Sequence, residues 1–483
     1  MDDYIATADG IMTGHWNPFD VARQDADFGR DCVIDRLVIP GSAAGGRGGV
    51  LPSGAGLYVH TSGRASKAYY AVVTCLDGVQ NTRDISEANS LAQPVAEQAG
   101  EGEPVFQREL PKMPFFNYKQ RRLQYVRWVG CPEYANVPSQ YYNWSVGVPD
   151  QLGEGVPLEL NLHRDGHSYW RTHYRIERDS TVLCPHDFPI NSWWCGYHEA
   201  LGTLKSFAQG VIQPYTERRL LAFVDWAAKT WPVGRNRILV TGCRGGASGS
   251  GALHLGLRHP EVFNLAISGH GVLDYASASR RTDRGGLSMA MSMQAIWGKP
   301  DWDIKTDQGK SFWEAHDMLR LVKAAPVEAD LPFLTLTSAW ESAHPFYEAM
   351  LSAHRGVIAD FAWGGARYVA VSAGGTYPNA IHLDVRKDKS YPAIAYVTGM
   401  KGLGNNRSLN TEFRWRDVVD KADRYEVTLS GGSEVVVGLR RVQSFRVEPG
   451  RSYAWENKLL PGAAVRKPRE VKPNTLAAGG QSG

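Results

Sequence analysis

Two serines of the chain, Ser248 and Ser250, lie in a glycine-rich segment, Arg237–Phe263, where small residues surround them. A serine hydroxyl attacks a carbonyl carbon when an imidazole takes its proton, and a carboxylate holds that imidazole in place. Cys243, in the same segment, offers a thiol that acts as a nucleophile if its pKa is lowered. The segment is therefore the first place in the chain to look for nucleophilic chemistry.

The same segment is predicted to form a strand, a tight turn and a helix. Ile238–Thr241 is a short apolar run typical of a buried strand, and Ala252–Arg258 has apolar residues at helical spacing until Pro260 ends it. Only small residues permit a sharp bend between these two elements. The arrangement resembles the nucleophile elbow of the α/β-hydrolase family, which includes serine esterases and peptidases.

This resemblance implies a serine, an acid and a histidine in that order along the chain. Ser248 is the predicted nucleophile, because Gly246–Ser250 places small residues on both sides of it. Glu341 is the predicted acid, in the turn that follows the expected strand Pro332–Thr337. His382 is the predicted histidine, because it follows the expected late strands of the core.

The spacing within the elbow departs from the family pattern. The position two residues after Gly242 holds Arg244, where the family carries its serine. Counting back about thirteen residues from His259, as the family pattern implies, gives Gly246. The turn is therefore longer than usual by about two residues.

This departure leaves alternatives open. Ser250 and Cys243 are alternative nucleophiles, and an elbow that carries no nucleophile is a further interpretation. His270, in Ser268–Gly271 after the next expected strand, is an alternative histidine outside the family order.

The resemblance also implies backbone N–H groups that stabilise a developing oxyanion. Gly166 and His167 follow the expected strand Pro157–His163, and Gly249 follows the predicted serine. These three residues are the expected oxyanion donors.

An aromatic segment, Asn191–Glu199, is the strongest candidate binding surface outside the triad. We expect it to form a wall of the substrate cleft, and the alternative is a packed aromatic loop. The expected substrate-binding residues are Trp193, Trp194, Tyr197 and His198.

The predicted fold class is α/β. Thr216–Trp231 is the clearest predicted helix, with an apolar stripe at helical spacing, and it leads directly into the strand of the elbow. Alternation of strands and helices predicts a parallel sheet with helices on both faces. The expected architecture is a doubly wound, mostly parallel α/β-hydrolase sheet flanked by two small all-β domains.

The N-terminal region has strand and hairpin signals. Ala68–Leu76 alternates and ends at Asp77-Gly78, a hairpin signal, and it resembles the Tyr-x-Val strand of fibronectin type III modules. The expected organisation is a fibronectin- or immunoglobulin-like domain at 1–110, the α/β-hydrolase domain at 111–390, a β-domain at 391–458 and a disordered tail at 459–483.

Composition limits the partners and cofactors. A formal net charge of +3 on 483 residues is too small to indicate nucleic acid, and the chain has no apolar stretch long enough to predict a membrane span. The six cysteines lack CxxC pairs and metal-like spacing, so no metal is expected. No GxGxxG or Walker motif is present, so no cofactor is expected.

The compartment and the oligomeric state are left open. Accessory β-domains favour a secreted or periplasmic protein whose leader is missing, whereas the acidic start Met1–Asp3 favours the cytoplasm. Cys184 and Cys195 are candidates for a disulfide if the chain is exported.

The family resemblance implies a serine hydrolase that cleaves small-molecule or polysaccharide-linked carboxylic esters through an acyl-enzyme. Two alternatives follow from the irregular elbow. One is a catalytically degenerate relative that serves as a binding or structural module, and the other is a peptidase of the same fold.

Overall fold

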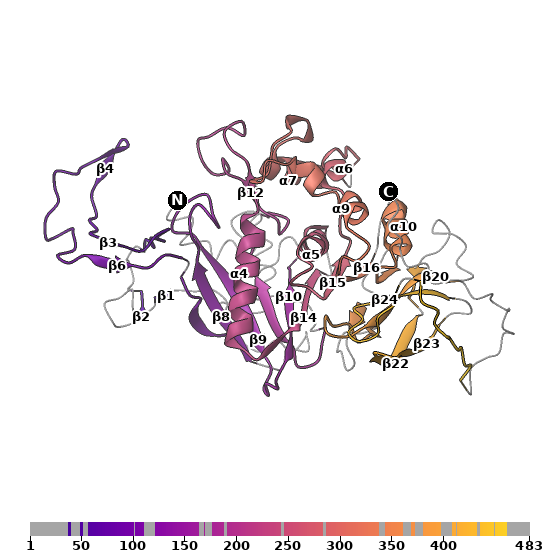
Figure 1. Cartoon of the computed structure of the whole chain (residues 1–483). Helices are drawn as coiled ribbons and strands as arrows, with labels where there is room; N and C mark the ends of the chain where they lie inside the picture. Colours follow the sequence, from indigo (N-terminus) through magenta and orange to yellow (C-terminus); the bar gives the residue numbers. More distant parts are fainter. Residues whose placement is uncertain are drawn as a thin grey trace.

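The computed structural model describes the central sheet, the helices around it and many of the connecting segments (Figure 1). The turn 243–245, the predicted acid turn 338–342 and the predicted tail beyond residue 460 lie outside the described residues. The described residues are 37–39, 49–51, 57–100, 102–110, 121–163, 169, 176–187, 191–242, 246–283, 286–337, 343–360, 369–371, 380–397, 408–411, 413–431, 435–448 and 450–460.

A ten-stranded sheet forms the centre of this described structure. From β11 across to β17 neighbouring strands are parallel, and the strands at both edges are antiparallel. Such a mostly parallel central sheet is typical of the α/β-hydrolase fold, so the predicted fold class is confirmed. In spatial order the strands are β21 (Ser408–Leu409), β17 (Val357–Asp360), β16 (Phe333–Thr337), β15 (Leu265–Gly269), β14 (Val233–Gly242), β10 (Val156–Asn161), β11 (Thr181–Pro185), β9 (Tyr141–Val148), β8 (Arg121–Trp128) and β7 (Val105–Leu110).

Helices cover one face of the sheet (Figure 1). Alternate strand residues, including Leu160, Val240 and Leu334, are fully buried in the core on this face. The predicted helix is present as α4 (Tyr215–Thr230), and Phe223 on its apolar stripe stacks on Trp144 with ring centroids 3.7 Å apart. The other helices of this layer are α5 (Gly246–Arg258), α9 (Met318–Ala324) and α10 (His344–Ser352).

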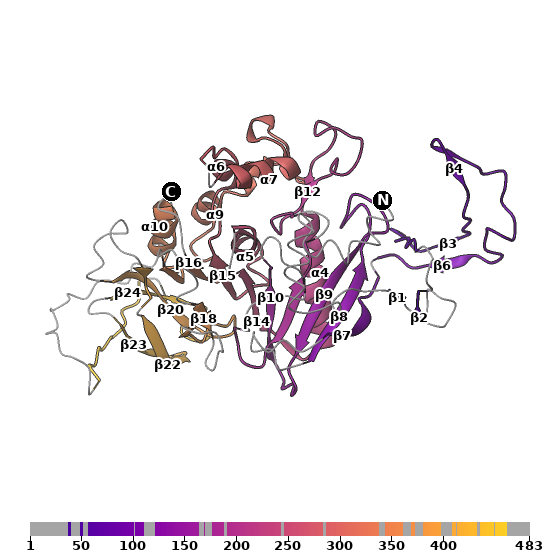
Figure 2. The same ribbon diagram turned by 180° about the vertical axis from the view of Figure 1, so that it is seen from behind.

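C-terminal strands lie beside the parallel end of the sheet (Figure 2). Leu239, Ile267 and Ile358 belong to a second core that also contains Tyr391 and Trp415. The strands expected to form a separate domain from residue 391 therefore complete a core of the main sheet, and the domain boundary stays a prediction. These strands pair as β20 (Tyr391–Val397) with β24 (Val435–Arg440), β22 (Arg414–Lys421) with β23 (Arg424–Ser430), and β18 (Val369–Val371) with β19 (Ala380–His382).

The N-terminal region contains only short strand pairs among its described residues. The predicted hairpin is confirmed, because β4 and β5 are joined by Asp77 and Gly78, whose φ angles are 49° and 80°. No residue described between 57 and 100 is buried, and a fibronectin type III module is not shown. The pairs are β1 (Val38–Ile39) with β2 (Gly49–Val50), β3 (Ser66–Ala68) with β6 (Val95–Glu97), and β4 (Cys75–Leu76) with β5 (Val79–Gln80).

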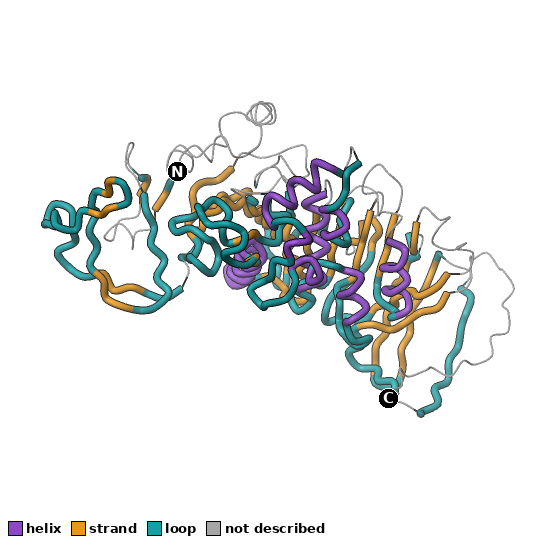
Figure 3. The backbone as a smooth tube through the Cα atoms, turned by 90° about the horizontal axis from the view of Figure 1, so that it is seen from above, coloured by secondary structure: helices purple, strands orange, loops and turns teal. Residues whose placement is uncertain are grey.

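A layer of short elements, here called the cap and made of residues 191–213 and 271–317, lies beyond the sheet on the side of α5 (Figures 1 and 3). Its core is aromatic and includes Trp193, Tyr275, Trp297 and Phe312. None of the described helices is long and apolar enough to cross a membrane. The cap contains β12 (Tyr197–His198), β13 (Ile212–Gln213), α6 (Tyr275–Ser279), α7 (Leu287–Trp297), η3 (Pro300–Trp302) and α8 (Phe312–Ala315).

The backbone of the first turns of α5 packs directly against the backbone at the ends of two strands, β14 and β15. A Cβ atom on Gly242, at the end of β14, would lie 1.9 Å from the carbonyl oxygen of Ser248. A Cβ atom on Gly249 would lie 1.9 Å from the carbonyl oxygen of Gly269, at the end of β15. Real Cβ atoms do not approach backbone so closely, so glycine is required at both positions.

We expect Gly249→Ala to lower the free energy of unfolding by about 3 kcal/mol or more, because the added methyl group forces α5 away from β15. The matched control is Gly153→Ala, because no atom lies within 4 Å of the added Cβ there. Chemical denaturation of both variants measures the difference. Equal stability of the two variants would contradict the contact between α5 and β15.

Candidate functional site

The strand–turn–helix unit predicted from the sequence is present. β14 ends at Gly242 and α5 begins at Gly246, so three residues of sequence, Cys243-Arg244-Gly245, connect them. Ser248 lies inside the first turn of α5 with none of its surface exposed. The predicted nucleophile is thus beyond the turn, within the contact between helix and strand.

Ser250, the alternative serine, has a structural role in α5. Its hydroxyl donates to the carbonyl oxygen of Gly246 at 2.5 Å and accepts from the backbone N–H of Val272 at 2.9 Å. These bonds tie the helix to the segment that follows β15. Gly249, predicted as an oxyanion donor, lies between the two serines in the backbone contact with Gly269.

The structure describes one of the four remaining predicted site residues, His382. Glu341, Gly166 and His167 lie outside the described residues. His382 ends β19, which pairs with β18 in a sheet separate from the ten-stranded one. The roles of these four residues stay predictions.

His270, the alternative histidine, lies at the carboxyl edge of the sheet. It follows β15 with a φ of 59°, a left-handed backbone conformation that few residues other than glycine adopt. Its backbone N–H donates to the carbonyl oxygen of Thr337 at 2.9 Å, which joins the ends of β15 and β16. The side chain is half-buried, and burial lowers the pKa of its imidazole.

The predicted aromatic wall is packed into the protein. Trp193, Trp194 and Tyr197 each keep 3% or less of their surface exposed, and His198 keeps none. The ring of Trp193 lies 3.5 Å from the position of a Cβ on Gly246, so this ring covers the start of α5. Of the two interpretations of this segment, a cleft wall or a packed loop, the burial of these side chains favours the packed loop. Trp193 contacts the start of α5.

A buried ion pair fixes the backbone of this aromatic loop. Trp193 and Trp194 have φ angles of 53° and 63°, two consecutive left-handed conformations that need support from their surroundings. Asp187 accepts from the N–H and the hydroxyl of Ser192 at 2.8 and 2.7 Å, and from Arg219 at 3.1 Å. The loop that covers α5 is therefore held by a carboxylate whose charge is paired.

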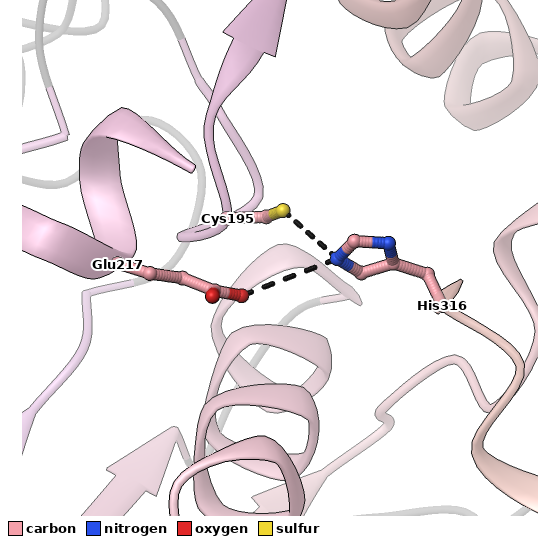
Figure 4. A group of neighbouring side chains, drawn as sticks. All are labelled: Cys195, Glu217 and His316. Carbon is pink, nitrogen blue, oxygen red and sulfur yellow. Dashed lines mark hydrogen bonds and ion pairs between the residues drawn. The ribbon is translucent and has the colours of Figure 1, made fainter. Parts of the chain in front are cut away.

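A second polar cluster lies beneath the cap, where Cys195, Glu217 and His316 point toward one another (Figure 4). Cys195 comes from the aromatic loop, Glu217 from the first turn of α4 and His316 from the end of α8. The Cys195 thiol lies 3.0 Å from Nε2 of His316, and that Nε2 lies 4.0 Å from a carboxylate oxygen of Glu217. All three side chains are buried.

The charge on Glu217 is balanced locally. Burial alone would raise the pKa of Glu217, but Arg258, with Nε 3.1 Å from the carboxylate, and His259 hold that pKa well below its usual range. Burial also raises the pKa of the Cys195 thiol and lowers the pKa of the His316 imidazole. The cluster therefore contains a neutral thiol, a neutral imidazole and a paired carboxylate.

Sequence reasoning missed this cluster. Along the chain, Glu217 follows Cys195 by 22 residues and His316 follows Glu217 by 99 residues, so no short sequence motif contains them. Cys184 and Cys195, the candidates for a disulfide, are not bonded to each other in the structure.

Comparisons with known proteins add a distant likeness in fold. No protein-family model and no curated protein matches the chain. The fluorophosphonate-binding serine hydrolase F of Staphylococcus aureus is similar over 44% of this chain and 78% of its own, at 15% identity and a TM-score of 0.30. An S-formylglutathione hydrolase from Agrobacterium tumefaciens is similar over 53% and 89%, at 16% identity and a TM-score of 0.35.

An acylaminoacyl peptidase from Pyrococcus horikoshii is similar over 55% of this chain and 46% of its own, at 13% identity and a TM-score of 0.31. The mostly parallel sheet described above is typical of the α/β-hydrolase fold, the fold of serine esterases and peptidases.

His254 of α5 gives the site a pH dependence that can be measured. Its Nε2 lies 2.8 Å from the carbonyl oxygen of Val272 and its ring stacks on Tyr275, so burial lowers the pKa of the imidazole from 6.5 to about 3. A lowered folded-state pKa means that stability is present above pH 6.5 and is lost as the pH falls toward 3.

We expect His254 alone to remove about 3 kcal/mol from the free energy of unfolding between pH 7 and pH 4. His254→Phe keeps a stacking ring without a titrating group, so its pH dependence over this range will be flatter. Denaturation curves at a series of pH values compare the two proteins. Parallel pH profiles would show that His254 is not held neutral in the folded state.

Proposed function

We propose that the chain is a binding protein built on the α/β-hydrolase fold, one that holds a small carboxylic ester or related molecule without hydrolysing it. The observation that supports this most directly is the burial of Ser248 within the first turn of α5. A nucleophile must come within about 3.5 Å of a carbonyl carbon. A hydroxyl with no exposed surface, inside a helix that contacts two strands, is not open to such an approach.

The sequence of the turn supports the same proposal. Where the family pattern places serine, two residues after Gly242, this chain has Arg244. A guanidinium binds carboxylate and ester oxygens through hydrogen bonds but is not a nucleophile. Binding without cleavage is the chemistry that this substitution favours.

The place of binding follows from the sheet. Ligands of open α/β sheets bind outside the carboxyl ends of the strands, which is where β14 leads into α5. Gly246 and Met289 are partly exposed there, and the sulfur of Met289 lies 3.9 Å from the position of a Cβ on Gly246. An acyl or aromatic group of a small ester matches a thioether in character.

The test offers short-chain aryl esters and a fluorophosphonate probe to the full chain. We expect the esters to raise the melting temperature without being consumed, because a ligand that binds only the folded state stabilises it. We expect no covalent labelling, and no ester turnover above the uncatalysed rate in either the unaltered chain or Ser248→Ala, whereas loss of a real nucleophile lowers turnover by orders of magnitude.

Heat-denatured protein is the control for labelling that does not depend on the fold. Labelling of the native chain that disappears in Ser248→Ala would contradict the proposal and establish a serine hydrolase. Labelling that disappears only in Ser250→Ala or Cys243→Ala would contradict it equally and assign the nucleophile to that residue. Cleavage of peptides would point to the peptidase alternative.

A further inference from the structure

We propose that Cys195, Glu217 and His316 form a binding site for a zinc ion that joins the cap to the body of the protein. The proposed function does not use this cluster. A thiolate, an imidazole and a carboxylate are the three kinds of protein ligand that zinc takes. The cluster brings one of each together in a closed, buried place (Figure 4).

The distances between the ligand atoms fit a single ion. The three atoms lie within 4.8 Å of one another, with 3.0 Å from sulfur to Nε2 and 4.0 Å from Nε2 to the carboxylate oxygen. Zinc bonds of about 2.0 to 2.3 Å at tetrahedral angles place such atoms roughly 3.3 to 3.6 Å apart. The separations between these atoms therefore have to change by about half an ångström to about one ångström for the site to close on the ion.

The orientation of His316 is already set for binding. Its Nδ1 lies 2.9 Å from the carbonyl oxygen of Phe312, an acceptor, so the ring carries its proton on Nδ1. The lone pair of Nε2 then points toward the Cys195 sulfur. Histidines that bind a metal through one ring nitrogen usually donate the N–H of the other ring nitrogen to a carbonyl or carboxylate, which fixes the ring.

Glu217 has outer support as well. Arg258 and His259 donate to its carboxylate, which fixes the position of the side chain. When zinc displaces the thiol proton, the thiolate and the carboxylate carry two negative charges, which face the two charges of the ion and the one charge of Arg258. The guanidinium of Arg258 then remains as a hydrogen-bond partner of the ligating carboxylate.

A buried hydroxyl without a described partner, that of Tyr275, belongs to the same core cluster as Cys195. Tyr275 is fully buried, and its hydroxyl has no hydrogen-bond partner among the residues that the structure describes. The ring of Tyr275 stacks on the ring of His316, with centroids 5.5 Å apart. A water molecule in the fourth position of the zinc would give Tyr275 the partner that it lacks.

The three ligands come from elements that are distant in sequence. The loop that carries Cys195 also carries Trp193, the residue over the start of α5, and His316 ends a helix of the cap. An ion shared with Glu217 of α4 would hold these cap elements against the helical layer. Loss of the ion is therefore expected to loosen the cap.

The experiment measures zinc in the full chain, produced in zinc-supplemented medium, by mass spectrometry of the metal. We expect one zinc per chain in the unaltered protein and in Cys184→Ser, a control that alters another buried cysteine. We expect Cys195→Ser and His316→Gln to lose the zinc. Cys195→Ser keeps a hydroxyl donor toward His316, so it preserves the packing of the metal-free cluster.

Two further measurements keep the proposal open to refutation if a variant folds poorly. A cobalt-loaded chain is expected to show a sulfur-to-cobalt charge-transfer band that Cys195→Ser lacks. A chelator is expected to lower the melting temperature of the unaltered chain and of Cys184→Ser, but not of Cys195→Ser.

Absence of zinc in the unaltered chain, both as purified and after refolding with zinc, would overturn the proposal. Equal zinc in the unaltered chain and in Cys195→Ser would overturn it too, because the ion would then lie elsewhere. None of these readouts depends on ester binding or hydrolysis, so this proposal and the proposed function fail separately.

Discussion

The contact between the backbone of α5 and the ends of β14 and β15 is the constraint on which the rest of the structure depends. Gly242 and Gly249 leave no room for a side chain between helix and strands. Such an approach aligns the helix start with the carboxyl edge of the parallel sheet, and it places Ser248 in the interior of that contact. The same packing that makes the unit resemble a nucleophile elbow thus removes its nearest serine from solvent.

Buried charge pairs hold the cap over this helix. Asp187 with Arg219 supports the left-handed backbone of the Trp193 loop, and Glu217 with Arg258 connects α4 to the end of α5. Breaking a buried pair by removing one partner typically costs about 3 to 5 kcal/mol, because a charge is left without compensation. These pairs therefore specify how the cap and the helical layer fit together, and the zinc site that we propose lies at that junction.

The sequence predicts local features of this structure well. The apolar run before Gly242, the helical spacing of α4 and the Asp77-Gly78 hairpin all follow from neighbouring residues, and all are present. Features that depend on distant residues were not predictable in the same way. Cys195 and His316 lie 121 residues apart in the sequence and come into contact only through the tertiary fold. No spacing of residues in the sequence predicts that contact. The aromatic residues of the segment Asn191–Glu199 are consistent with a buried loop and with a wall of a binding cleft. Only the packing seen in the structure distinguishes these two interpretations.

The central claim is that the first turns of α5 stay packed against β14 and β15, so that Ser248 does not become exposed to a substrate. Amide hydrogen exchange of peptides from residues 247–258, followed by mass spectrometry, tests it directly. We predict that these amides exchange only by global unfolding, as slowly as those of β14 and β15. Because the helix start is buried, local opening of this element costs as much free energy as unfolding of the whole domain. Exchange within minutes while the two strands stay protected would show that the helix start opens on its own. That result would contradict the account and return Ser248 to the role of nucleophile.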